Sequence, residues 1–168
     1  MADVRPGPFR ESVGVTIDTN AVGPFLESKT GAIRAALAEK MGLTSRNLAV
    51  AVSAKVTGQV LQVRTGRLSG SIRTLPTETS PNEITGGAAA GGGPVVYARS
   101  LEYGSRAHII QAINAKVLHF QIGGKEIFAR SVMHPGTRAY AFMRGTLDEQ
   151  ATSIIEGFQE TAAEAAAS

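Results

Sequence analysis

Residues 143–162, MRGTLDEQATSIIEGFQETA, carry a helical repeat of apolar side chains. The apolar positions recur every three or four residues, while Glu149, Glu156 and Gln159 fall elsewhere around the axis. Those positions are Met143, Leu147, Ala151, Ile154, Phe158 and Ala162. The pattern predicts a long amphipathic C-terminal helix. Asp148 and Glu149 near its start suit the helix dipole, and we expect its alanine-rich end, about residues 160–168, to fray or to dock on a partner.

Immediately upstream, the sequence predicts a β-hairpin. Residues 117–122 and 127–133 are rich in β-formers and flank Gly123-Gly124-Lys125-Glu126, which is typical of a tight, glycine-led turn. His119 alternates with Leu118 and Phe120 and so should lie on the opposite face of its strand. Before the hairpin, residues 95–103 predict a short helix or turn that Gly104 ends.

Two more helices are expected in the first half of the chain. The first begins at Gly23-Pro24 and ends at Gly42, because proline suits the first helical position and glycine suits the position after the last turn. The second begins at Thr44 or Ser45, whose hydroxyls can cap free amides. One apolar face is formed by Leu26, Ile33, Leu37 and Met41, and the other by Leu48, Val52, Val56, Val60 and Val63.

The remaining segments predict strands and loops. Residues 13–17 alternate apolar and polar residues, as a half-buried strand does. Residues 72–75 form a possible strand that runs into turn residues at Pro76 and Pro81-Asn82, with a hairpin partner at residues 83–85. The run Gly-Gly-Ala-Ala-Ala-Gly-Gly-Gly at residues 86–93 has almost no side chain to pack, so we expect a flexible loop there.

This order of elements predicts an α+β domain, in which two or three helices pack on a small, mainly antiparallel sheet. A chain of 168 residues fits one domain, residues 1–168, with a flexible N-terminus of about residues 1–11. Its 43% hydrophobic content is enough for a core.

The composition excludes several kinds of functional site. The chain has no cysteine, which excludes disulfides, thiolate metal sites and cysteine nucleophiles. The start carries Pro6, Pro8 and charges in place of the apolar core of a signal peptide, and no apolar window is long enough to cross a membrane. The net charge of +3 and the pI near 9.5 permit contact with phosphate without requiring it.

The motifs of common catalytic sites are missing. Gly124-Lys125 is followed by Glu126 and lacks the first glycine of a P-loop, and no Gly-x-Ser-x-Gly elbow occurs. His108, His119 and His134 are too widely spaced to ligate a metal from one helix face. We therefore predict no catalytic residue, metal site or cofactor, and we expect a protein that is not an enzyme.

Arg64, Arg67 and Arg73 cluster near the end of the second predicted helix. Cations there interact well with helix carbonyls or with another subunit, and they could also meet nucleic-acid phosphates. Both interpretations are compatible with the sequence.

Three ordered segments together resemble one family. They are Arg64-Thr65-Gly66-Arg67-Leu68-Ser69-Gly70-Ser71-Ile72, Tyr97-Ala98-Arg99-Ser100-Leu101-Glu102-Tyr103-Gly104-Ser105-Arg106, and His134-Pro135-Gly136-Thr137-Arg138 followed by Phe142-Met143-Arg144. Their order and spacing are similar to those of the neck and tail-completion (head-tail joining) proteins of tailed bacteriophages, over about residues 20–160. The chain departs from that family at Ala141 and Gly145, where relatives often carry proline.

The resemblance implies a structural virion protein that forms a homo-oligomeric ring, expected to be a hexamer, at the head-tail junction. Its partners would be the head connector or adaptor protein and the tail tube protein, with DNA passing close by through the channel and no membrane. It would be made in the cytoplasm of the bacterial host and end in the virion, at the neck or tail end. The residues that we expect at subunit or partner interfaces are Arg67, Tyr97, Arg99, Glu102, Tyr103, Arg106, His134 and Arg138.

Two other function classes compete with this hypothesis. A basic nucleic-acid-binding domain is suggested by the pI and by Arg64, Arg67 and Arg73. A hydrolase that uses His134 is the third, although His134-Pro135-Gly136 is more typical of a turn that redirects the chain into the last helix, with the histidine as a hydrogen-bonding turn residue.

Overall fold

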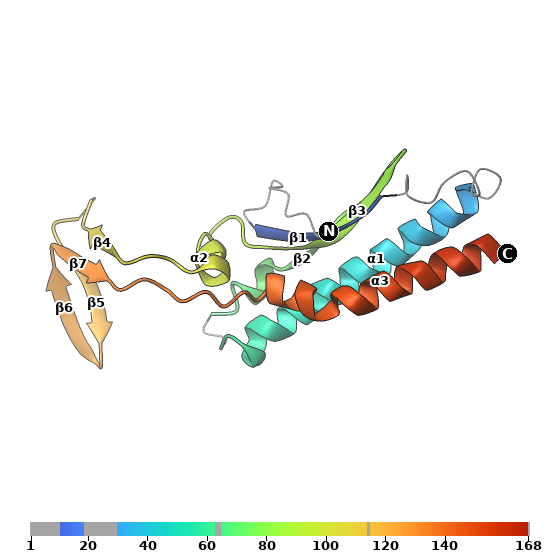
Figure 1. Cartoon of the computed structure of the whole chain (residues 1–168). Coiled ribbons are helices and arrows are strands. Elements are labelled where there is room, and N and C mark those ends of the chain that lie inside the picture. The colour runs from blue at the N-terminus through green and yellow to red at the C-terminus, as the bar shows by residue number, and fades with distance from the viewer. Residues whose placement is uncertain (1–10, 19–29, 63–64, 114, 168) are drawn as a thin grey trace.

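The computed structural model describes residues 11–18, 30–62, 65–113 and 115–167, and within them the fold is α+β, as predicted (Figure 1). The helices are α1 (Thr30–Ala54), α2 (Ala98–Tyr103) and α3 (Arg144–Ala167). The strands are β1 (Glu11–Asp18), β2 (Arg73–Ser80), β3 (Glu83–Ala90), β4 (His108–Gln111), β5 (Leu118–Ile122), β6 (Lys125–Ala129) and β7 (Ser131–His134). The expected N-terminal flexibility concerns residues outside the described ones, apart from Glu11, which begins β1.

The main sheet is antiparallel in the order β1-β3-β2. The predicted strand at residues 13–17 and the hairpin that turns at Pro81-Asn82 are both confirmed, the hairpin being longer than expected. Pro76 lies inside β2 and makes no turn. It sits in the register irregularity between Leu75 and Glu78, where a strand tolerates the missing amide donor.

The prediction of a flexible glycine-alanine loop at residues 86–93 is wrong. Residues 86–90 form the second half of β3, the central strand, and all five are buried, while residues 91–93 make the bend that follows. The reason is steric, because α1 packs directly on the backbone of this strand. A Cβ built on Gly86 would lie 2.5 Å from Ser45 Oγ and 2.7 Å from Met41 Cγ.

The two helices predicted in the first half are one continuous helix. Helix α1 continues through Gly42. Thr44 and Ser45 are buried within this helix, so they do not cap a helix start. Six of the predicted apolar positions are confirmed as buried, because they face the same sheet and α3, and this packing outweighs the weak helix propensity of glycine. The buried residues of the two sets are Ile33, Leu37, Met41, Leu48, Val52 and Val56. Gly23-Pro24, Leu26 and Val63 lie outside the described residues.

The helix ends earlier than predicted. A π-helical turn, Lys55–Gln59, follows Ala54 and contains Gly58 at φ 140°, a conformation that glycine adopts without steric cost. Val60 therefore lies beyond the helix and is 36% exposed.

The long C-terminal helix is confirmed as α3, which lies along α1 (Figure 1). Met143, Leu147 and Phe158 are buried against α1 and the sheet. The expectation of a frayed end is wrong for residues 160–167, which stay helical because Ala162, Ala165 and Ala166 pack against the core. Asp148 and Glu149 lie beyond the first turn, and Glu149 pairs with Lys55 at 2.8 Å.

The predicted β-hairpin is confirmed as β5 and β6, joined at Gly123-Gly124. The second predicted strand is split after Ala129, so that β7 pairs with β4. These two ribbons form an extension, residues 106–134, which we call the arm. In Figure 1 it projects from the end of the molecule that carries α2, away from the long helices.

Two chain segments pass side by side at the base of the arm. Ser105 and Thr137 exchange backbone hydrogen bonds of 2.8 and 3.1 Å. Gly136 lies so close to the other segment that a Cβ would approach Ser105 O to 2.3 Å. The glycine of His134-Pro135-Gly136 is thus explained by backbone approach, together with its φ of 93°.

Candidate functional site

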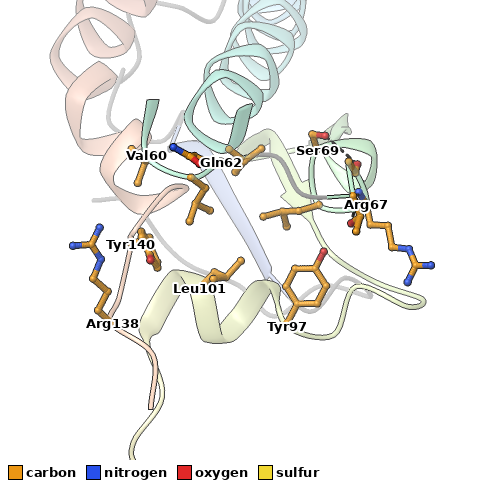
Figure 2. Close-up of a pocket in the computed structure, with 13 residues that line it drawn as sticks. Val60, Gln62, Arg67, Ser69, Tyr97, Leu101, Arg138 and Tyr140 are labelled. Atoms are coloured by element: carbon orange, nitrogen blue, oxygen red, sulfur yellow. Dashed lines mark hydrogen bonds between the residues drawn. The ribbon is translucent and has the colours of Figure 1, made fainter. Parts of the chain in front are cut away.

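An open pocket of about 1040 Å³ lies where residues 56–62, which follow α1, meet the turn at residues 65–69, the start of α2 and residues 138–140 (Figure 2). The described lining residues therefore come from three regions of the sequence, within residues 56–69, 97–101 and 138–140. The lining consists of Val56, Val60, Leu61, Gln62, Thr65, Gly66, Arg67, Leu68, Ser69, Tyr97, Leu101, Arg138 and Tyr140.

The floor of the pocket is apolar and continuous with the core. Val56 is buried, and Leu61, Leu68 and Leu101 are half-buried and pack against the main core cluster. An apolar side chain that entered the pocket would therefore meet the edge of the core, and its burial would be favourable.

The rim of the pocket is cationic and aromatic. Arg67 and Arg138 are both exposed and lie at opposite ends, with Tyr97 and Tyr140 between them (Figure 2). The Arg138 guanidinium carbon is 4.5 Å from the centroid of the Tyr140 ring, a cation-π distance. Such a rim suits a segment that presents an apolar side chain flanked by carboxylates.

Three of the eight predicted interface residues, Arg67, Tyr97 and Arg138, meet at this pocket. Arg99 and Tyr103 lie instead on an exposed face of α2. There the Tyr103 ring has two cationic neighbours, because the guanidinium carbons of Arg99 and Arg144 are 5.5 and 4.8 Å from its centroid. Arg144 lies in one of the segments that carry the resemblance, and it is not among the eight predicted interface residues.

Glu102 is a correction to the predicted interface. Its side chain is buried, 1% exposed, and its carboxylate is used inside the chain. Oε2 accepts a 2.9 Å hydrogen bond from Met143 N, and Oε1 accepts from Arg144 N at 2.9 Å and Arg144 Nε at 3.2 Å. Glu102 therefore caps the free amides at the start of α3 and places negative charge at the positive end of the helix.

Arg106 and His134 lie at the base of the arm. His134 pairs across the ribbon with His108, and their ring centroids are 5.0 Å apart. His134 Nδ1 accepts a 3.1 Å hydrogen bond from Gly136 N, which confirms the predicted hydrogen-bonding turn residue. The fold brings these two histidines together, yet no group of three or more metal-ligating side chains occurs in the described part of the chain.

The arginines of the expected cluster have different surroundings in the structure. Arg73 is half-buried, and its Nη2 donates a 3.3 Å hydrogen bond to Gly91 O. This side chain therefore stabilises the bend after β3. Arg67 is exposed at the pocket, and Arg64 lies outside the described residues.

Sequence reasoning missed two central pocket residues. Leu101 and Tyr140 lie within or between the segments that carry the resemblance, but they were not considered because each is an ordinary apolar or aromatic residue in isolation. No local sequence signal marks the pair, because their contact is made by the tertiary fold, in which Tyr140 N donates to Leu101 O at 2.8 Å.

Comparisons with family models, with curated proteins and with solved structures found no match to this chain. Among the described residues, no helix combines the length and apolar character needed to cross a bilayer.

Proposed function

We propose that this chain is a structural virion protein of a tailed phage or a phage-derived particle, and that it forms a ring at the head-tail junction which completes the tail or joins it to the head. One observation carries the proposal. The three segments on which the family resemblance rests, far apart in the sequence, converge at the pocket and at the α2–α3 connection beside it. Their convergence in one region of the fold supports the proposal.

The exposed chemistry of this surface also favours assembly. An apolar floor with a cationic and aromatic rim has the composition of a protein-protein contact, in which aromatic and arginine side chains provide most of the binding energy. In a ring, each subunit uses two different faces, so a pocket on one face needs a complementary segment on its neighbour or on the adjoining protein.

The experiment is deletion of the gene, followed by electron microscopy of the particles and counts of filled heads, free tails and joined virions. Unjoined heads and tails would support a connector, and abnormally long or unfinished tails would support tail completion. Normal joined particles in normal numbers would overturn the proposal.

Complementation sharpens this test. A copy of the gene that encodes Arg67→Glu and Arg138→Glu reverses the charge at both ends of the pocket rim. We expect this copy not to restore joined particles. The matched control is Arg46→Glu, an exposed reversal on α1 far from the pocket lining, which should restore them.

A basic nucleic-acid-binding domain is the second candidate. It is favoured by exposed cations at the pocket and along the arm, including Arg67, Lys125 and Arg130. Binding through several phosphates would weaken steeply as salt rises. An absence of binding to duplex DNA at low salt would remove this candidate.

A further inference from the structure

The arm is built from apolar residues that it does not bury. Among the described residues 106–113 and 115–134, none is buried. Large apolar side chains remain 57% to 90% exposed, namely Ile109, Ile113, Ile122, Phe128 and Met133. Two-stranded ribbons are marginally stable alone, and a soluble surface seldom displays this much apolar area without a partner.

The pairing register gathers part of this apolar area on one face. Ile109 lies directly opposite Met133 in the β4–β7 ribbon, so the two side chains share a face. In the β5–β6 ribbon, Phe128 lies opposite His119 and stacks on it with ring centroids 4.6 Å apart. The arm thus presents apolar side chains in fixed positions.

The arm is also basic. It carries Arg106, Lys116, Lys125 and Arg130 against the single acidic residue Glu126, which lies 3.8 Å from His119. None of the four cations has an ion-pair partner among the described residues. An occupant that covers the arm should therefore be acidic and should contribute apolar contact.

The outer face of α3 has the complementary character. The helix contains five acidic residues against one arginine, and all five are exposed. Glu149, Glu156, Glu160 and Glu164 are separated by seven, four and four residues, which places them along one side of the helix. Ile155 beside them is 57% exposed, and among these four glutamates only Glu149 has an ion-pair partner in the described structure, Lys55.

We propose that the arm of one copy docks on the acidic outer face of α3 of a second copy. The arm projects away from its own long helices (Figure 1), so the two complementary surfaces are suited to meet between molecules. The pocket is excluded as the receptor because Arg67 and Arg138 give its rim the same sign of charge as the arm. The contact joins two different faces, and repetition of it generates a ring or an open filament.

This inference deepens the proposed ring and names the faces that form it, and it is tested on the purified chain. Sedimentation equilibrium at low salt measures self-association of four variants. The arm reversal is Lys125→Glu with Arg130→Glu, and the helix reversal is Glu156→Lys with Glu160→Lys. The third variant combines both reversals, and the fourth is the control described below.

Each reversal alone should lower the association constant by about tenfold, since two charged side chains of the contact change from attraction to repulsion. The combined variant should recover to near the original value. The control adds Glu39→Lys and Glu78→Lys to the arm reversal, which restores the net charge through exposed residues on α1 and β2, and it should not recover.

Three results would overturn the inference. They are a chain that stays monomeric at high concentration, a reversal that leaves association unchanged, and recovery in the net-charge control. Loss of DNA binding on arm reversal with unchanged self-association would point to nucleic acid as the occupant. This experiment uses the purified chain and no virus particles. Self-association through the arm could therefore be found even if gene deletion left joined particles intact. Failure of this inference and failure of the proposed function are thus distinguishable.

Discussion

The carboxylate of Glu102 lies at the N-terminus of α3 and holds Arg144 by both its backbone amide, at 2.9 Å, and its side-chain Nε, at 3.2 Å. The two residues are 42 positions apart, and the bond ties α2 to the helix that closes the core. Arg144 in turn lies over the Tyr103 ring, one residue from Glu102 in the sequence. Glu102, which the sequence predicts at a subunit contact, therefore holds α2 and the start of α3 together beside the pocket.

Glu102→Gln should lower the free energy of unfolding by about 2 kcal/mol, and Glu102→Ala should lower it further. Glutamine keeps one acceptor but turns an amide donor toward Met143 N or Arg144 N, and it removes the charge that favours the helix dipole. Urea unfolding followed by circular dichroism measures the change. The matched control is Glu164→Gln on the exposed face of α3, which should stay within about 0.5 kcal/mol of the parent. Equal stability of Glu102→Gln and the parent would contradict the capping role.

Gly86→Ala should destabilise the protein by about 1 to 3 kcal/mol. The new methyl would overlap Ser45 Oγ and Met41 Cγ, and Met41 is fully buried, so the side chain has little room to move. Gly31→Ala is the control, because a Cβ there meets nothing within 4 Å. A tolerated alanine at position 86, measured by the same unfolding experiment, would mean that α1 does not pack on the backbone of β3.

Ser45→Ala should leave stability unchanged or raise it by up to about 1 kcal/mol. The Ser45 hydroxyl is buried and has no hydrogen-bond partner in the described structure, so its removal releases an uncompensated polar group. It should also reduce the cost of Gly86→Ala, because one of the two overlapping atoms disappears. A double-mutant cycle of the two substitutions measures this coupling, and strict additivity would contradict it.

The elements that sequence predicted well are those with a local signal. The repeat from Met143 to Phe158 marks α3, and Gly123-Gly124 marks the β5–β6 turn, because each depends on residues close together in the chain. The identity of β3 was missed because its small residues are required by a helix about 45 positions earlier. A run of glycine and alanine looks the same whether it is free in solvent or pressed beneath a helix.

The candidate site shows the same limit. Arg67, Tyr97 and Arg138 were chosen from three separate segments and do meet at one pocket. Glu102 was assigned to the surface because nothing near it in the sequence shows that the amides of residues 143 and 144 would lie within hydrogen-bonding distance. Burial of a charged residue depends on partners that only the tertiary fold supplies.

The conformation of Ala141 is incompatible with proline, the residue often found at this position in the family that the sequence resembles. Ala141 has φ 48°, the left-handed region, and its amide donates to Glu102 O at 3.2 Å. Proline can neither adopt this φ, because its ring fixes φ near −65°, nor donate this hydrogen bond, because it has no amide hydrogen. Ala141→Pro should therefore destabilise the protein by about 3 kcal/mol or more.

Ala141→Gly should have the opposite effect and stabilise by about 1 kcal/mol, since glycine adopts positive φ without the steric cost that a Cβ imposes. Ala139→Gly is the control two residues earlier. Ala139 is exposed and has no positive φ, so glycine there should cost about 0.5 to 1 kcal/mol through the greater freedom of the unfolded chain. Thermal unfolding of the three variants measures the expected destabilisation by Ala141→Pro and Ala139→Gly and the expected stabilisation by Ala141→Gly. If both glycine substitutions destabilise equally, the approach to α3 does not require a left-handed residue at position 141.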